Sequence, residues 1–106
     1  LQITRQIGNK YGEGEALLNL GNTFIQLNQY SEALEYLQAS LTIFREIASR
    51  ANEAKTLKSL AELYQNTGNL NLALEYCDQG LAIATELQIS LAEEYQKLKN
   101  QLMEEA

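Results

Sequence analysis

The sequence contains no proline, no histidine and no tryptophan, and it has a single cysteine. Without proline, the strongest helix breaker is missing from the whole chain. Without histidine, there is no imidazole to act as a general base or to complete a common zinc site. Cys77 has no second cysteine for an internal disulfide, which is typical of a reducing, cytoplasmic setting. We therefore expect no catalytic residues, no metal site and no cofactor.

Positive charge is also scarce. Eight Lys and Arg residues stand against fourteen Asp and Glu residues, which gives a formal net charge of −6. A nucleic-acid surface needs clustered basic side chains. Only the pairs Lys55/Lys58 and Lys97/Lys99 approach this, and each lies among carboxylates. No run approaches the roughly 20 apolar residues that span a bilayer. We expect neither nucleic acid nor membrane as a partner.

The chain repeats itself at a spacing of forty residues. Ala33-Leu34-Glu35-Tyr36 returns as Ala73-Leu74-Glu75-Tyr76, and Leu17-x-x-Leu20 returns as Leu57-x-x-Leu60. Leu41-Thr42-Ile43 matches Leu81-Ala82-Ile83 and has an earlier copy at Leu1-Gln2-Ile3. A fixed period of this size is typical of stacked repeat proteins, in which each unit buries its apolar face on the next.

Helical periodicity and turn residues predict the elements. Apolar residues recur at helical spacing between short polar breaks, and good helix formers dominate the composition. Gly8 and Gly68 are predicted to end helices, and Asn52 and Asn69 to begin them. Ser90-Leu91-Ala92-Glu93 reads as a capping box. The predicted helices cover residues 1–7, 13–27, 30–49, 52–67, 70–87 and 90–103, with a loop over 9–12.

These elements form a single domain over residues 1–106. We divide it into the end of a preceding repeat (1–8), two repeats (12–50 and 52–88) and a capping helix (90–104). The last helix loses the repeat pattern, since Asn100 stands where Leu60 would recur, and its face is polar, as terminal units require. We expect its Leu98 and Leu102 to contact the second hairpin. The first edge has no such cap, so we interpret the chain as a fragment of a longer protein.

The repeated positions resemble the tetratricopeptide repeat, whose hairpins follow W-x2-L-G-x2-Y and then A-x3-F. This chain has Leu17-x2-Leu20-Gly21-x2-Phe24 and Ala33-x3-Leu37, and later Leu57-x2-Leu60-Ala61-x2-Tyr64 and Ala73-x3-Cys77. Small residues fall where helices must approach closely: Gly21/Ala61, Ala33/Ala73 and Ser40/Gly80. We expect Ala33 and Ala73 to be fully buried, and the stripe Leu17, Leu20 and Phe24 to lie in the core.

Two departures from that family pattern stand out. The usual period is 34 residues, and the proline that often ends the hairpin is replaced by Arg45 and Thr85. The second helix can therefore be longer. In this respect the chain resembles the long tetratricopeptide subclass of kinesin light chains and LGN/Pins-type adaptors, and similar long repeats of bacterial multi-repeat proteins.

The resemblance implies an all-α fold: an α-α superhelix of antiparallel helical hairpins, a tetratricopeptide solenoid, closed by the capping helix. In that family one face of each first helix lines a concave groove, where asparagines hold the backbone of an extended peptide. The matching positions here are Glu15, Leu18, Asn19, Asn22, Ile25 and Gln26 in the first hairpin, and Lys55, Lys58, Ser59, Glu62, Gln65 and Asn66 in the second.

Several of these positions also have another interpretation. Asn19 and Asn22 are also compatible with solvated polar residues or with bonds to a neighbouring hairpin. Leu18 and Ile25 are apolar on a face that should be wet, which favours a contact surface, although single exposed apolar residues are common. Lys55 and Lys58 suggest a clamp for the carboxylate at a peptide's C-terminus. Such a clamp needs further basic and Asn groups on neighbouring repeats, and the acidic Glu62 on the same face opposes it.

The sequence thus predicts a protein–protein interaction scaffold that binds an extended peptide, and not an enzyme. The alternative is a structural spacer or self-association module within a larger regulatory or catalytic protein, acting through the uncapped N-terminal edge. An RNA-binding helical-hairpin repeat is opposed by the acidic balance and by the forty-residue period.

Overall fold

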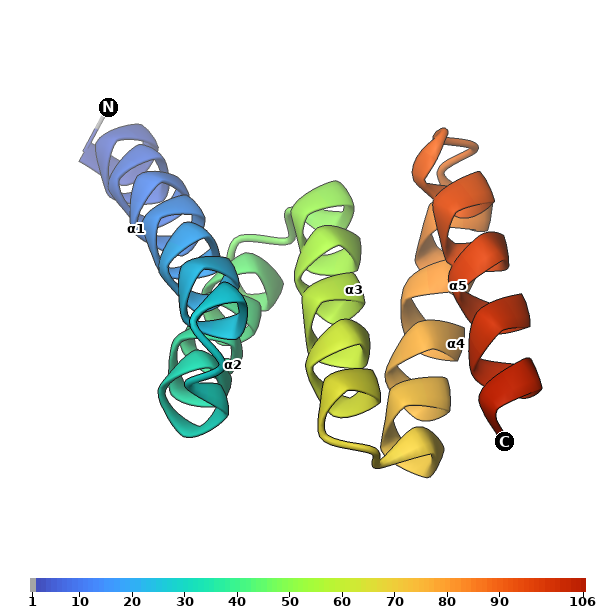
Figure 1. The fold of residues 1–106 in the computed structure, drawn as a ribbon. Coiled ribbons are helices and arrows are strands. Elements are labelled where there is room, and N and C mark those ends of the chain that lie inside the picture. The colour runs from blue at the N-terminus through green and yellow to red at the C-terminus, as the bar shows by residue number, and fades with distance from the viewer. Residues whose placement is uncertain (1) are drawn as a thin grey trace.

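The computed structural model describes residues 2–106, with side chains from residue 8 onward. Five helices follow one another, and no strand occurs in this part of the chain (Figure 1). They are α1 (Gln2–Gln26), α2 (Tyr30–Glu46), α3 (Arg50–Asn66), α4 (Leu70–Glu86) and α5 (Leu91–Glu105).

The helices stack in chain order. α1 packs on α2 and α3 packs on α4, so each pair forms a hairpin. The second helix of each hairpin then packs on the next helix along the chain, α2 on α3 and α4 on α5. The stack is elongated, with extents of 49 × 32 × 17 Å. The predicted all-α solenoid of helical hairpins is therefore confirmed. The copy at Leu1-Gln2-Ile3 lies outside the residues whose side chains are described.

The four turns close in the same way. In each, the second residue after the helix has a positive φ: Asn28 (60°), Ala48 (56°), Gly68 (82°) and Gln88 (54°). The next amide then donates back to a carbonyl five residues earlier, as from Gln29 to Phe24 at 2.9 Å and from Ser49 to Phe44 at 2.9 Å. This is the hydrogen bond of a Schellman cap, which satisfies carbonyls at the helix end. The predicted stop at Gly68 is confirmed, and so is the cap at Asn69, whose Oδ1 accepts from the Leu72 amide at 3.3 Å.

Several predicted helix ends are wrong. α1 continues through Gly8 and the expected loop over 9–12. A glycine costs a helix only about 1 kcal/mol relative to alanine, which is a weak stop signal by itself. α2 ends at Glu46, before the expected Ser49, because Ala48 takes the left-handed turn. Ser49, not Asn52, is the N-cap of α3.

Two predicted capping residues therefore make other contacts. Asn52 lies within α3, where its Nδ2 donates to Ser49 Oγ at 2.9 Å. The capping box at Ser90 does not form its side-chain bond: Ser90 is already helical in φ and ψ, and only its carbonyl accepts from Glu93. α5 nevertheless begins at Leu91, as expected.

The small residues of the repeat lie in the core, where neighbouring helices pack most closely. Ala33 and Ala73 are completely buried, as predicted. At Gly21, an added Cβ would lie 2.6 Å from Cγ of Leu37, so a side chain there would displace Leu37 of α2. Overfilling such sites forces side chains and backbone apart, which explains why the pattern keeps small residues at these crossings.

The third small pair, Ser40 and Gly80, is used differently in the two hairpins. Ser40 Oγ donates to the Gly14 carbonyl at 2.9 Å and lies 3.5 Å from Thr56 Oγ1, so it joins α1, α2 and α3. At Gly80 the space of that side chain is occupied by Tyr95 of α5. The Tyr95 hydroxyl donates to the carbonyl of Ala54, which is the repeat equivalent of Gly14. The carbonyl at this repeat position thus accepts from a hydroxyl in both hairpins, from Ser40 of α2 in the first and from Tyr95 of α5 in the second.

The predicted core stripe on α1 is only partly correct. Leu17 and Phe24 are half-buried, but Leu20 is 42% exposed, whereas its equivalent Leu60 is completely buried. Leu18, expected on the wet face, is 9% exposed and belongs to the core. The difference between Leu20 and Leu60 follows from their positions in the stack. α3 packs between α2 and α4, whereas the outer face of α1 has no neighbour among the described residues.

α5 is one-sided. Tyr95, Leu98 and Leu102 are buried, as expected for the two leucines, and α5 packs on α4. The opposite face, including Glu93, Gln96 and Asn100, is exposed. The last helix therefore closes the apolar surface of the second hairpin and turns a polar surface outward.

Candidate functional site: a carboxamide-lined groove between the first helices

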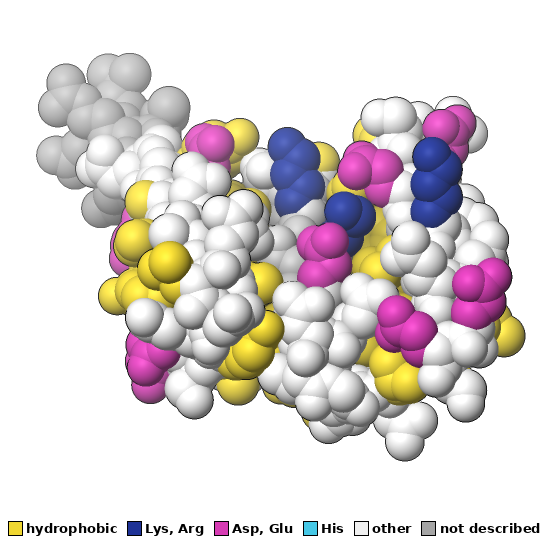
Figure 2. Space-filling model, viewed as in Figure 1, with side chains coloured by type: hydrophobic (Ala, Val, Ile, Leu, Met, Phe, Trp, Pro, Cys, Tyr) yellow, Lys and Arg dark blue, Asp and Glu magenta, His cyan; other side chains and the backbone are white. Residues whose placement is uncertain are grey.

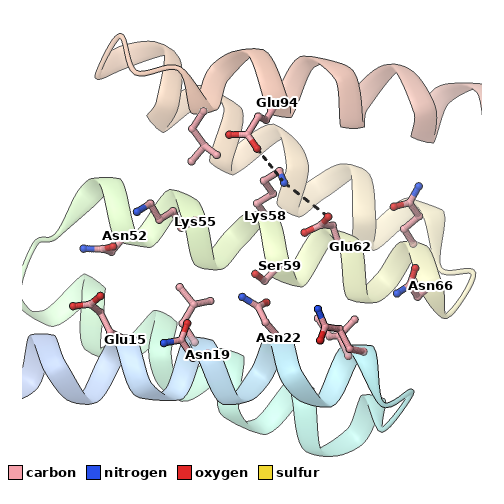
Figure 3. A pocket seen from close by; sticks show the side chains of 15 residues that line it. Glu15, Asn19, Asn22, Asn52, Lys55, Lys58, Ser59, Glu62, Asn66 and Glu94 are labelled. Atoms are coloured by element: carbon pink, nitrogen blue, oxygen red, sulfur yellow. Dashed lines mark ion pairs between the residues drawn. The ribbon is translucent and has the colours of Figure 1, made fainter.

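An open groove of about 650 Å³ runs between α1 and α3 and reaches the start of α5 (Figure 3). Its walls come from one face of each helix, because residues spaced by three and four positions share a helical face. The lining residues are Glu15, Leu18, Asn19, Asn22, Ile25 and Gln26 of α1, Asn52, Lys55, Lys58, Ser59, Glu62, Gln65 and Asn66 of α3, and Leu91 and Glu94 of α5.

All twelve positions assigned to the groove from the sequence lie around this one cavity. Three lining residues were missed: Asn52, Leu91 and Glu94. Asn52 was interpreted as a helix cap, although it lies one turn before Lys55 on the same face. Leu91 and Glu94 carry no repeat signal, because α5 departs from the pattern.

Carboxamides dominate the facing walls. Asn19 and Asn22 point from α1 toward α3, where Ser59 lies, and Asn66 lies at the end of α3, on the opposite wall (Figure 3). The side chains of Asn19, Asn22 and Asn66 make no hydrogen bond to the described part of the protein, whereas Gln65 Nε2 donates to Glu105 Oε1 at 3.0 Å. A carboxamide both donates and accepts, so an unpaired one can bind a peptide unit whatever its side chain.

Apolar side chains form the base of the groove. Leu18 is nearly buried, and Ile25 and Leu91 are half-buried. Leu18 lines the cavity, but only 9% of it is exposed, because it also packs into the core. Ser59 is likewise 6% exposed. The groove therefore has a packed apolar base with polar groups along its rims.

The charged residues of the groove differ in whether they are paired with an opposite charge. Lys58 Nζ lies 3.8 Å from a carboxylate oxygen of Glu62 and 3.7 Å from one of Glu94, and its side chain is only 23% exposed. Glu15 and Lys55 are exposed and form no ion pair with the described residues. Lys58 is thus neutralised by two carboxylates, which opposes the carboxylate clamp and leaves Lys55 as the accessible cation of the groove.

Other chemical groups lie away from the groove. Burial raises the pKa of the Cys77 thiol to about 11, with Asp78 adding to the shift. In the described part of the chain, no group of three or more Asp, Glu, His or Cys side chains is placed to hold a metal ion. Within the same residues, no helix combines the length and apolarity needed to cross a bilayer.

Paired helices stacked in register, with first helices lining an open groove, define an α-solenoid of helical hairpins. Two family models of the tetratricopeptide repeat match the chain, over residues 1–46 and 54–87. The chain therefore belongs to the tetratricopeptide repeat family, whose repeats generally mediate protein–protein interactions and are typically non-catalytic. No curated protein matches the chain.

Proposed function

We propose that the groove between α1, α3 and α5 binds an extended segment of a partner protein. The observation that carries the proposal is the set of unpaired carboxamides, Asn19, Asn22 and Asn66, on both walls of one cavity. An extended peptide exposes its N–H and C=O groups in both directions, and carboxamides can satisfy both. The half-buried Ile25 and Leu91 offer apolar surface to the peptide's side chains.

Selectivity would come from the charged end of the groove. Glu15 and Lys55 are exposed, opposite in charge and equivalent in the repeat, so they favour a segment with a basic and an acidic side chain at matching positions. Lys58 contributes less, because a ligand carboxylate would have to compete with Glu62 and Glu94. Two hairpins offer less than the ~800 Å² per partner of a standard interface, so binding by this chain alone should be weak.

The test is selection from a displayed library of random twelve-residue peptides, followed by titration of the selected peptides into labelled protein. We expect the side-chain amide signals of Asn19, Asn22 and Asn66 to shift on titration. Asn22→Ala should weaken binding about 5–10-fold, as expected for one lost hydrogen bond of about 1 kcal/mol. Lys55→Glu should change which peptides are selected.

The matched control is Gln38→Ala, an exposed carboxamide on α2 outside the groove. If Asn22→Ala and Gln38→Ala bind the selected peptides equally, the contact surface lies elsewhere on the stack. The alternative of a spacer or self-association module predicts no groove-directed peptides and a concentration-dependent size in solution.

A further inference from the structure

Three charged side chains meet at the end of the groove between α3 and α5. Lys58 of α3 reaches between Glu62, one helical turn later, and Glu94 of α5 (Figure 3). Its Nζ lies 3.8 Å from the first carboxylate and 3.7 Å from the second. Charged side chains of both signs accordingly gather on the surface over α3 and α5 (Figure 2). We call these three residues the α3–α5 charge cluster.

The packing of α5 brings the third charge into the groove. Tyr95 is completely buried, and its hydroxyl donates to the Ala54 carbonyl of α3. Ala54 lies one turn before Lys58, so Glu94, the residue beside Tyr95, is held next to the Lys58 ammonium. Leu91, one turn earlier on α5, also lines the groove and is half-buried. The contact that fixes the last helix therefore also positions the charge cluster.

Lys58 leaves both carboxylates free to accept hydrogen bonds. Its two distances exceed the roughly 2.7–2.9 Å of a charge-assisted hydrogen bond. Among residues 8–106, no other group donates to the side chain of Glu62 or Glu94. The Lys58 side chain is 23% exposed, whereas those of Glu62 and Glu94 are 46% and 60% exposed. The carboxylates are thus more accessible from the open side of the groove than the ammonium that they share.

The cluster carries one uncompensated negative charge, because one ammonium stands against two carboxylates. The Glu105 carboxylate adds to this charge, since it approaches the same wall through its hydrogen bond from Gln65. A partner's cation would make the cluster neutral, whereas a partner's carboxylate would bring a third negative charge to it. Electrostatic complementarity decides which partners an interface accepts, so this end of the groove favours a cation.

Arginine suits the cluster better than lysine. Its planar guanidinium presents five N–H donors on several edges, so it can donate to carboxylates of two different helices at once. Its aliphatic stem can lie along apolar surface while its head reaches the charges. Leu91 offers that surface one turn before Glu94.

We propose that the α3–α5 charge cluster recognises an arginine of the bound partner segment. The inference rests on the peptide groove proposed above and names the side chain that its α5 end selects. The guanidinium bridges Glu62 and Glu94 on the open side of the Lys58 ammonium. Lys55, which is exposed and unpaired among the described residues, takes an acidic side chain of the same segment.

The spacing of these two side chains follows from helix geometry. Lys55 and Glu62 are seven residues apart on α3, or roughly 10 Å along its axis at 1.5 Å per residue. An extended chain covers that distance in about three residues. The favoured segment therefore carries Asp or Glu about three positions from its arginine.

The test uses the twelve-residue peptides selected from the displayed library. Among peptides that Asn22→Ala protein binds more weakly, we expect arginine to be enriched at this spacing from Asp or Glu. Replacing that arginine with citrulline, its neutral isostere, should weaken binding about 10-fold, and replacing it with lysine about 3-fold. Glu62→Gln and Glu94→Gln should each weaken the arginine peptide about 3–5-fold and leave the citrulline peptide unchanged.

The direction of the change in Lys58→Gln separates two modes of binding. This variant removes the competing cation, so the arginine peptide should bind about 2–5-fold more tightly. A cluster that holds a partner's carboxylate predicts weaker binding instead. The matched control is Glu93→Gln, a neighbouring exposed carboxylate of α5 that does not line the groove. It should leave every affinity unchanged, and all variants should unfold within about 2 °C of the natural chain.

The inference is overturned if the Asn22-dependent peptides lack arginine, if Glu94→Gln binds like Glu93→Gln, or if Lys58→Gln weakens the arginine peptide. Each of these results leaves the peptide groove standing, because Asn22→Ala tests the groove separately. Arginine peptides that depend on Glu94 and not on Asn22 would support the cluster and remove the carboxamides from the binding surface. A selection that yields no groove-directed peptide overturns both proposals.

Discussion

The junction of Gly80 with Tyr95 offers the sharpest test of how the last helix is held. Tyr95 is completely buried, and its hydroxyl donates to the Ala54 carbonyl. A Cβ at residue 80 would lie 2.7 Å from Cε1 of Tyr95 and closer still to Cζ and the hydroxyl. Tyr95 cannot yield without leaving its hydrogen bond, so Gly80→Ser should displace the ring.

The expected loss can be worked from these contacts. Overpacking a filled site costs about 1–3 kcal/mol, and leaving a buried hydrogen-bonding group unpaired costs about 1–3 kcal/mol. Serine is a better helix former than glycine by roughly 0.5 kcal/mol. The net destabilisation is about 2–5 kcal/mol, or roughly 10–20 °C in the unfolding midpoint of a chain of this size.

The assay is thermal and urea unfolding followed by circular dichroism, with hydrogen exchange to report α5 separately. Gly12→Ser is the matched control, because Gly12 is also helical and nothing lies within 4 Å of an added Cβ. That control should be neutral or slightly stabilising. If Gly80→Ser unfolds with the midpoint of Gly12→Ser, the packing of Tyr95 on Gly80 is not what holds α5.

A compensating change makes the test stricter. In the first hairpin Ser40 itself donates to the Gly14 carbonyl, the repeat equivalent of the Ala54 carbonyl. Gly80→Ser combined with Tyr95→Thr, which removes the ring, should therefore let the new serine donate to Ala54. Tyr95→Thr alone should cost about 3–5 kcal/mol, as for other large core truncations. The double variant should lose less than the sum of the two losses, since contacting residues couple by up to about 3 kcal/mol. Strict additivity would refute the equivalence of the two junctions.

The groove could be predicted from the sequence because helical period alone decides which residues share a face. Asn19, Asn22 and Asn66 needed only the positions of α1 and α3, and the forty-residue repeat placed those helices side by side. The continuous helix α1 could not be predicted in the same way. Gly8 suggested a helix end, but a single glycine weakens a helix only slightly and does not end it on its own.

The sequence fails to predict burial where a helix has no neighbouring repeat to cover it, and it fails to predict contacts between residues that do not recur in the repeat. Leu20 and Leu60 are identical in type and register, so no pattern could show that one is exposed and the other buried. Tyr95 and Gly80 meet across fifteen positions with no periodic signal. The cavity residue Glu94 was missed for the same reason, since α5 does not follow the repeat.

Three further predictions concern stability. Ala33→Leu should cost roughly 1–3 kcal/mol, because Ala33 is completely buried at the crossing of α1 and α2; a wild-type midpoint would contradict the hairpin packing. Burial raises the pKa of Tyr95, and raises that of Cys77 from 9.0 to about 11, so the unfolded state loses these protons first. Stability should therefore be full below pH 9 and fall as the pH rises through 9–11, which unfolding midpoints measured across that range will check; a midpoint unchanged up to pH 11 would contradict the burial of the thiol. Finally, a chain ending at Leu87 should lose stability and self-associate. Without α5, the apolar face of α4 around Cys77 and Ile83 is open, and burial of such surface contributes about 25 cal/mol per Å². Sedimentation and unfolding should both report the loss, and a truncated chain that stays monomeric with the wild-type midpoint would show that α5 is not the cap of this stack.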